Sequence, residues 1–205
     1  MNHETKTVAL AVTGASGIQY AMRLLECLLQ HDAKVYLMFS KAAQIVAGME
    51  TDWNLPARTA DIQEELCKRH SVTGDQLKVF GESQWTAPVA SGSGVPDAMV
   101  VCPCTTGTLA AIANGSCDCL IERAADVVIK ESRKLIVMPR EMPFSPIHLE
   151  NMLKLARIGV TILPPNPGFY NKPETVDDLI DFVVARVLDQ LKIEQSLMPV
   201  WGADE

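Results

Sequence analysis

The stretch "VALAVTGASGIQY", Val8 to Tyr20, decides the fold of this chain. Its first five residues are small or branched and apolar, as in a strand that is buried on both faces. The segment Thr13 to Gly17 then leads into a helical pattern. Gly14 and Gly17 would let backbone amides approach an anion at the helix start, with the Ser16 hydroxyl as an extra donor. The stretch predicts a strand, a tight turn and a helix, and the turn either holds a phosphate or is a ligand-free connection.

The same alternation of strand and helix continues along the chain. Apolar runs predict strands at residues 8–12, 34–39, 98–102, 135–138 and 160–163, with a weaker strand at 77–80. Helical patterns lie at residues 17–29, 41–49, 59–70, 106–114, 121–132, 147–158 and 175–192. Strands that alternate with helices form parallel sheets. We predict one α/β domain over residues 1–205: a doubly wound, Rossmann-like or flavodoxin-like, mostly parallel sheet with helices on both faces, followed by a tail at 193–205.

Composition narrows the class of protein. With 205 residues, 48% of them hydrophobic, the chain can bury a core without disulfides or metal. Its formal charge of −7 disfavours nucleic acid and anionic membranes as partners, because both require clustered positive charge. Without a signal-peptide pattern or an apolar run of membrane-spanning length, we expect a cytoplasmic protein with free cysteines. The pairs Cys102/Cys104 and Cys117/Cys119 match no common zinc spacing, and we predict no metal site.

Polar loops follow the predicted strands, at the edge where doubly wound sheets bind ligands. The segment Cys104 to Thr108 is a second helix start that combines hydroxyls with a glycine. Two such starts favour a nucleotide or flavin phosphate, although N-capping by Thr105 or Thr106 is a competing explanation of the second. The first turn lacks both the spacing G-x-G-x-x-G and the lysine of a P-loop. In addition, Ser40 stands where an acidic residue would hold a nicotinamide ribose.

Two cations on one predicted helix are further candidates. Arg123 and Lys130 lie seven residues apart, so a helix brings both to nearly the same face, where they would meet an anion. The alternative is a surface salt-bridge ladder from Glu122 through Asp126 to Lys130, which spacing alone favours. Nothing else in this helix decides between the two interpretations.

Two other charged segments have structural alternatives. Arg140 and Glu141 directly follow a predicted strand, either as a cation beside a general acid or as a structural ion pair. Residues 177–181 carry the spacing D-D-x-x-D, which isoprenoid diphosphate enzymes use to bind magnesium. Here Thr175 with Asp178 three residues later predicts an N-terminal cap instead, and we reject magnesium binding.

A series of motifs gives the chain a resemblance to a known family. In order they are TGASG, SKAA followed by ETD, ASGS, CPCTTGTLAAIANG, LIERAADVVIKE, PREMPFSPIHLENM and PPNPGFY. From about Val8 to Trp201 the chain resembles the UbiX flavin prenyltransferases, which belong with the flavin-binding cysteine decarboxylases. The resemblance implies reduced FMN as prenyl acceptor and dimethylallyl monophosphate as donor, with no metal. The product would be prenylated FMN, with new bonds at flavin N5 and C6, for use by a UbiD-type decarboxylase.

The resemblance also implies three sets of site residues. The FMN-binding set is Gly14, Ala15, Ser16, Ser40, Cys104, Thr105, Thr106, Gly107 and Arg140. The donor-binding set is Trp85, Ser91, Gly92, Arg123, Lys130, Glu141, Tyr170, Arg186 and Trp201. The catalytic set is Ser16, Glu50, Lys130 and Glu141.

Each implied role matches the chemistry of its residue. Glu141 would be the acid/base group at the phosphate, and Ser16 with Glu50 would relay the proton lost when the new ring closes at C6. Trp85 and Trp201 would offer aromatic faces to an allylic cation. Each tryptophan also has a structural alternative. Trp85 would only pack its loop, and Trp201 would lie in a loose tail or against a neighbouring subunit.

The remaining expectations concern the leaving phosphate and the assembly. Arg123 and Lys130 would stabilise the phosphate in place of magnesium. Members of the family assemble as dodecamers with sites near subunit contacts, so we expect some groups to act across subunits and the tail 193–205 to close near the active site. Two other functions are kept: a flavin-dependent cysteine-type decarboxylase, and a flavin carrier without catalysis. The loop "PCTTGT" lacks the asparagine of the decarboxylases, and a carrier would not need the donor set.

Overall fold

Six parallel strands form the centre of the molecule. The computed structural model describes residues 5–53 and 55–199. The strand order is β3-β2-β1-β4-β5-β6, and each neighbouring pair is parallel. The strands are β1 (Thr7–Val12), β2 (Lys34–Phe39), β3 (Leu77–Phe80), β4 (Ala98–Cys104), β5 (Lys134–Pro139) and β6 (Thr161–Ile162). Every residue of β4 is buried, which accounts for its continuous apolar sequence.

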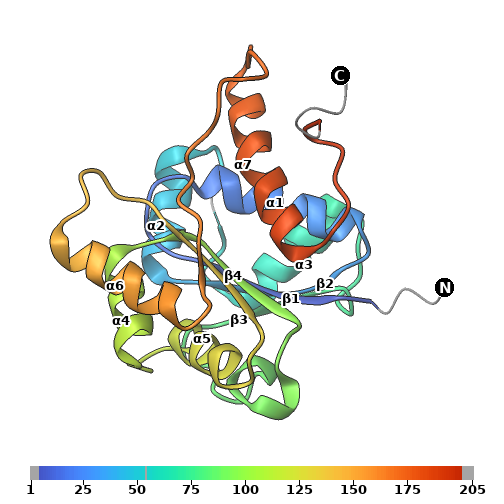
Figure 1. Cartoon of the computed structure of the whole chain (residues 1–205). Helices are drawn as coiled ribbons and strands as arrows, with labels where there is room; N and C mark the ends of the chain where they lie inside the picture. Colours follow the sequence, from blue (N-terminus) through green and yellow to red (C-terminus); the bar gives the residue numbers. More distant parts are fainter. Residues whose placement is uncertain (1–4, 54, 200–205) are drawn as a thin grey trace.

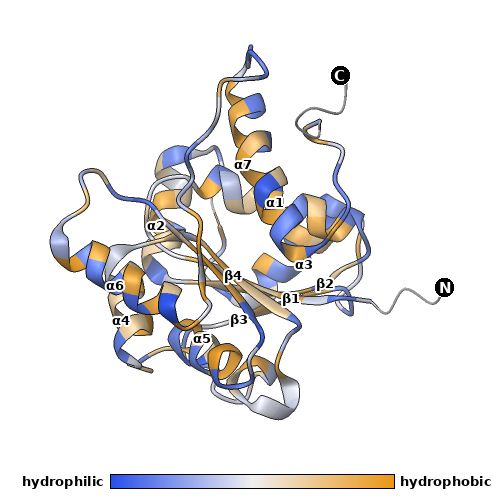
Figure 2. Cartoon of the chain, viewed as in Figure 1, coloured by the Kyte–Doolittle hydropathy of each residue, from blue (hydrophilic) through white to orange (hydrophobic). Residues whose placement is uncertain are grey.

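Helices cover both faces of this sheet. They are α1 (Ile18–Gln30), α2 (Lys41–Glu50), α3 (Thr59–His70), α4 (Thr106–Asn114), α5 (Leu120–Lys130), α6 (Pro146–Arg157) and α7 (Val176–Leu191), with short 3-10 turns η1 (Pro88–Ala90) and η2 (Gly92–Gly94). Helices α1, α3 and α7 pack on one face and α4, α5 and α6 on the other (Figure 1). Figure 2 shows the apolar strands between helices whose outer residues are hydrophilic. Each face therefore has its own hydrophobic core.

The predicted α/β fold and its elements are confirmed, with shifts at the ends of some elements. The bounds of β3, α3 and α4 are those predicted. Strand β4 continues two residues beyond its predicted end, so Cys104 lies in the strand instead of the loop. Strand β6 has two residues instead of four, because the edge strand pairs only with β5. No helix in the described part of the chain is long and apolar enough to cross a membrane.

The strand order reverses between β1 and β4. From β1 the chain builds outward through β2 and β3, and it then returns to β4 on the other side of β1. Ligands of open α/β sheets bind at such a switch point, outside the carboxyl ends of the strands. Helices α1 and α4 both begin there, so the two helix starts noted in the sequence meet at this position.

Candidate active site

Thr13 joins the two loops at the switch point. Its side chain is 2% exposed, and its Oγ1 donates to the carbonyl oxygen of Pro103 at 2.7 Å. Thr13 Oγ1 also accepts from the amide of Thr105 at 2.8 Å. This pair of bonds fixes the β1–α1 turn against the start of α4. Nothing in the sequence near Thr13 points to this role, because its partners lie about 90 residues away.

Glu50, at the end of α2, closes the start of α1. Its Oε2 accepts from the amides of Gly17 at 2.8 Å and Ile18 at 3.3 Å. Burial opposes ionisation of this carboxyl, but hydrogen bonds from the Ser16 hydroxyl and from these amides, with the charge of Arg140, hold the pKa of Glu50 below its usual value. The structure thus brings Ser16 and Glu50 together. It also shows that two amides of α1 face a carboxylate and are not free for a phosphate.

Other amides at the switch point remain open to an anion. Within the described residues, no hydrogen bond is donated by the amides of Gly14, Ala15, Ser16, Thr106 and Gly107. Thr105 caps α4, since its hydroxyl accepts from the amide of Thr108 at 3.1 Å. A Cβ on Gly107 would meet its nearest atom at 3.9 Å, so there is space beside the first turn of α4. These open amides and this space fit the phosphate or polar edge of a flavin nucleotide.

The start of α2 borders the same region. The Ser40 hydroxyl caps the helix by accepting from the amide three residues on, at 3.0 Å. The carboxylate of Glu82 accepts from the amide of Lys41 at 3.2 Å. This contact has no local signal in the sequence, because the two residues are 41 positions apart. A Cβ on Gly14 would lie 2.4 Å from the Cβ of Ala42. Gly14 is therefore required for the close packing of the first turn against α2.

Arg140 ties the end of β5 to the first turn. Its Nε donates to the carbonyl oxygen of Ser16 at 3.2 Å. Glu141 is exposed beside it, and its Oε1 accepts from the amide of Met142 at 3.1 Å. No ion pair joins Arg140 to Glu141 in the described structure, so the structural ion pair considered from the sequence is wrong. Arg140 instead adds a positive charge beside Ser16 and Glu50.

Cys104 differs from its predicted role as a loop residue at the flavin. The residue is fully buried at the end of β4, and its thiol donates to the carbonyl oxygen of Thr105 at 3.3 Å. Burial raises the pKa of the Cys104 thiol. The thiol itself is therefore not available to a ligand at the carboxyl edge.

The salt-bridge ladder that spacing favoured on α5 is wrong. Asp126 pairs with Arg123 at 2.7 Å, and Lys130 pairs with Glu131. Glu122 turns back to the start of the helix, where its carboxylate accepts from the amide of residue 118 at 2.7 Å. An i,i+3 pair and a local helix cap thus replace the i,i+4 series.

The cations of α5 instead meet the loop between β3 and β4. Arg123 Nε donates to the carbonyl oxygen of Ala90 at 3.1 Å. A Cβ on Gly92 would lie 3.0 Å from Lys130 Nζ, so the ammonium group rests against this glycine. Four members of the predicted donor set, Ser91, Gly92, Arg123 and Lys130, therefore form one group, which we call the α5 group.

The α5 group is remote from Glu141 within one chain. Lys130 ends α5 just before β5 begins at Lys134, whereas Glu141 follows the far end of β5. Six residues of strand at about 3.3 Å each separate the two by about 20 Å. One chain therefore does not bring Lys130 and Glu141 to the same phosphate.

The remaining predicted residues lie on other segments of the chain. Arg186 pairs with a carboxylate three residues further along α7 and lines a cavity of about 300 Å³ between β6 and α7. Tyr170 is 74% exposed after β6, and Trp85 is half exposed before η1. Ile193 and Gln195, at the start of the tail, form hydrogen bonds with the last turns of α7. Trp201 lies outside the described residues.

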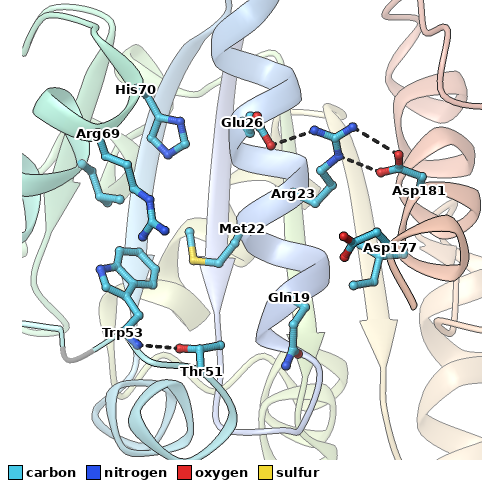
Figure 3. Close-up of a pocket in the computed structure, with 12 residues that line it drawn as sticks. Gln19, Met22, Arg23, Glu26, Thr51, Trp53, Arg69, His70, Asp177 and Asp181 are labelled. Atoms are coloured by element: carbon cyan, nitrogen blue, oxygen red, sulfur yellow. Dashed lines mark hydrogen bonds and ion pairs between the residues drawn. The ribbon is translucent and has the colours of Figure 1, made fainter. Parts of the chain in front are cut away.

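A cavity of about 640 Å³ lies between α1, α3 and α7 (Figure 3). Its charges are largely satisfied within the chain. Arg23 pairs with Asp181 and Glu26, each at 2.7 Å, and the Arg69 guanidinium lies over the Trp53 ring, 5.4 Å from its centroid. The 12 residues drawn in Figure 3 include none of the predicted site residues. The candidate site is therefore assigned to the switch point and not to this cavity.

The fold and the helix starts at its switch point define a nucleotide-binding α/β protein. The family model described as Flavoprotein matches residues 1–188. The flavin prenyltransferase UbiX of Pseudomonas aeruginosa is 55% identical over 195 residues, which cover 95% of this chain and 93% of that protein. The chain therefore belongs to the Flavoprotein family and, within it, to the UbiX flavin prenyltransferases, as its motifs predicted.

Two solved structures extend the comparison to three dimensions. A dodecameric FMN-dependent UbiX-like decarboxylase from Escherichia coli O157:H7 has a TM-score of 0.83 and 41% identity, covering 96% of this chain and 100% of that one. AnUbiX (PadA1), in complex with FMN and dimethylallyl pyrophosphate, has a TM-score of 0.86 and 37% identity. The match covers 98% of this chain and 100% of that chain. The likeness therefore extends over nearly the whole of each chain.

Proposed function

We propose that this protein transfers the dimethylallyl group of dimethylallyl monophosphate to reduced FMN without a metal ion. The C–O bond to phosphate breaks as C1 of the dimethylallyl group bonds to flavin N5, which gives up its proton. The dimethylallyl double bond then takes up a proton at C2 while C3 bonds to flavin C6, and the proton at C6 is lost. Membership of the UbiX family supports this reaction, as does the complex of a relative with FMN and a dimethylallyl diphosphate. The observation that carries the proposal is the carboxylate of Glu50 at the start of α1, next to Ser16 and beside open amides at the switch point.

The residues at the carboxyl edge would have two roles, the binding of FMN and the transfer of a proton. FMN supplies the nucleophilic flavin ring when bound. The amides of Gly14 to Ser16 and of Thr106 and Gly107 would hold its polar groups, with Ser40 at the neighbouring helix start. Glu50 is ionised at neutral pH, so it would accept the C6 proton through the Ser16 hydroxyl. Arg140 would place its positive charge beside the same turn.

The donor site would be completed by a second copy of the chain. Glu141 projects from the carboxyl edge, whereas the α5 group lies about 20 Å away along β5. We therefore propose that a neighbouring copy supplies Arg123 and Lys130, in a dodecamer like that of the E. coli relative. Tyr170, Arg186, Trp85 and the tail with Trp201 would border this shared site. The proposed setting is the cytoplasm, with a UbiD-type decarboxylase as recipient of the product.

Mass spectrometry of the released flavin tests this function. Purified protein would be incubated anaerobically with reduced FMN and dimethylallyl monophosphate, without added metal. We expect a flavin heavier by one five-carbon prenyl unit that is absent when protein is omitted. Unmodified FMN, under conditions where it is demonstrably bound and reduced, would contradict the proposal. A second incubation with dimethylallyl diphosphate then shows which part is wrong: prenylated flavin would mean that only the donor was wrong, and unmodified flavin that the reaction was wrong.

A further inference from the structure

The cations of the proposed donor site share one feature. Each is paired with a carboxylate of its own segment, one or three residues further along the chain. The pairs are Arg123 with Asp126 at 2.7 Å, Arg186 with Asp189 at 2.7 Å, and Lys130 with Glu131. The spacing itself is not confined to the donor set, since Arg23 with Glu26 and Arg58 with Asp61 also pair three residues apart. What distinguishes these three pairs is that each engages a cation of the proposed donor site.

Each carboxylate uses a donor that a phosphate would need. Arg123 directs Nε to the Ala90 carbonyl oxygen and NH1 to Asp126, so two edges of its guanidinium are engaged. A phosphate that approaches NH1 would have to compete with the carboxylate for this nitrogen. The same holds for Arg186, whose NH1 donates to Asp189.

The Lys130–Glu131 pair is packed directly against a predicted donor residue. A Cβ on Gly92 would lie 2.2 Å from Glu131 Oε1 and 3.0 Å from Lys130 Nζ. The hydrogen bond from Lys130, and then its charge, hold the pKa of Glu131 below its usual value, so this carboxylate is ionised at neutral pH. Glu131 thus keeps the ammonium group of Lys130 at Gly92, where the donor would arrive.

We propose that Asp126, Glu131 and Asp189 are counter-ions that hold these cations in the absence of donor and take them back when inorganic phosphate leaves. They are positioning residues, and the inference rests on the proposed function. Without them, three unpaired cations would bind the leaving phosphate tightly and retain it after the transfer. With them, the site exchanges one set of anions for another, which favours release of phosphate.

Phosphate binding to the Asp126→Asn variant tests this role. Titration calorimetry with inorganic phosphate would be done on the FMN-loaded oligomer, next to prenyl-transfer kinetics. We expect phosphate to bind about fivefold more tightly at low salt, with less difference at high salt. Both KM for the donor and kcat should fall, because release of phosphate becomes slower. A carboxylate that only oriented Arg123 would give the opposite sign, with weaker phosphate binding and a higher KM.

The control variant is Asp61→Asn. Asp61 pairs with Arg58 on the exposed side of α3, with the same i,i+3 spacing at 3.9 Å, so it removes the same charge away from the donor set. Glu131→Gln is the second test variant and guards against misfolding of the first. Unchanged or weaker phosphate binding in both test variants overturns the inference, as does equal tightening in the control. The transfer assay on wild-type protein separates the two proposals. If the inference is overturned but wild-type protein transfers the prenyl group, only the counter-ion role is wrong. If wild-type protein transfers nothing, the proposed function itself is wrong.

Discussion

At the scale of single residues, the carboxyl edge is organised by side chains that come from distant parts of the chain. The turn "TGASG" predicts an anion at the start of α1, and the anion there is the carboxylate of Glu50, 33 residues from Gly17. Glu82 has a similar place at the start of α2. Local sequence shows that a helix start can accept an anion, but not which one, because the partner is chosen by tertiary packing.

Replacing Glu50 by glutamine tests its two roles. The variant keeps the size of the side chain and loses its charge, so we expect normal FMN binding but at least tenfold slower prenyl transfer. Unfolding should cost about 0.5 kcal/mol less at pH 7, because a charge at a helix N-terminus is lost. The folded pKa of Glu50 is lowered, so this stabilisation is present above the usual carboxyl range and disappears as pH falls through the lowered pKa. Urea unfolding of both proteins at pH 7 and at about pH 3 measures it; a difference that persists at the lower pH would contradict this account.

Substitution of two glycines at the site distinguishes an effect on packing from an effect on FMN binding. Gly14→Ala should destabilise the fold by about 1–3 kcal/mol, since its Cβ would lie 2.4 Å from that of Ala42. Gly107→Ala should be as stable as wild type or more so, because its Cβ meets nothing nearer than 3.9 Å and alanine favours the helix. The added methyl would nevertheless stand beside the open amides of α4, so FMN affinity should fall. Thermal unfolding and FMN fluorescence titration measure the two effects, and an unaltered affinity for FMN would remove Gly107 from the site.

At the scale of elements, periodicity was enough to predict the sheet and its helices. The strands are buried on both faces and the helices carry clear caps, such as Thr175 with Asp178, so apolar runs and capping residues predict them well. The ends differ where pairing decides the length: β4 runs on to Cys104 because it pairs with β5 up to Pro139. The link between elements through Thr13 has no local signal. A threonine after a strand looks like any turn residue until Pro103 and Thr105 are placed against it.

Replacing Thr13 by valine tests that link. Valine keeps the shape of the side chain but leaves the Pro103 carbonyl oxygen without the Oγ1–H donor and the Thr105 amide without its acceptor in a buried place. We expect a loss of about 2–3 kcal/mol of unfolding free energy. FMN affinity should fall as well, because α1 and α4 would no longer begin at a fixed separation. Thr13→Ser restores the hydroxyl and should recover most of both quantities; a serine variant as weak as valine would mean that the methyl group matters more than the hydrogen bonds.

At the scale of the whole molecule, the sequence predicts a set of site residues, and the fold places the members of that set in different parts of one chain. The motifs are consecutive in sequence, and the parallel sheet then sends them to different places. Ser16 and Arg140 meet because the strands before them end at one edge, and the last residue of α2, Glu50, reaches the same turn. Lys130 ends a helix that returns to the opposite edge, which is why we propose that a second copy of the chain supplies it.

Mixing two variants tests whether the donor site is shared. Lys130→Ala should bind FMN like wild type but use the donor poorly, and Glu141→Gln should do the same, since neither lies among the open amides of the flavin site. If one site takes Lys130 from one copy and Glu141 from another, coexpression of the two variants in equal amounts leaves roughly a quarter of the sites with both native residues. The mixed oligomer should then recover about that fraction of wild-type transfer, measured as prenylated flavin per bound FMN. Sites built within a single chain would recover nothing, because every copy carries one of the two defects; loss of FMN binding in Lys130→Ala would instead place this lysine with the flavin.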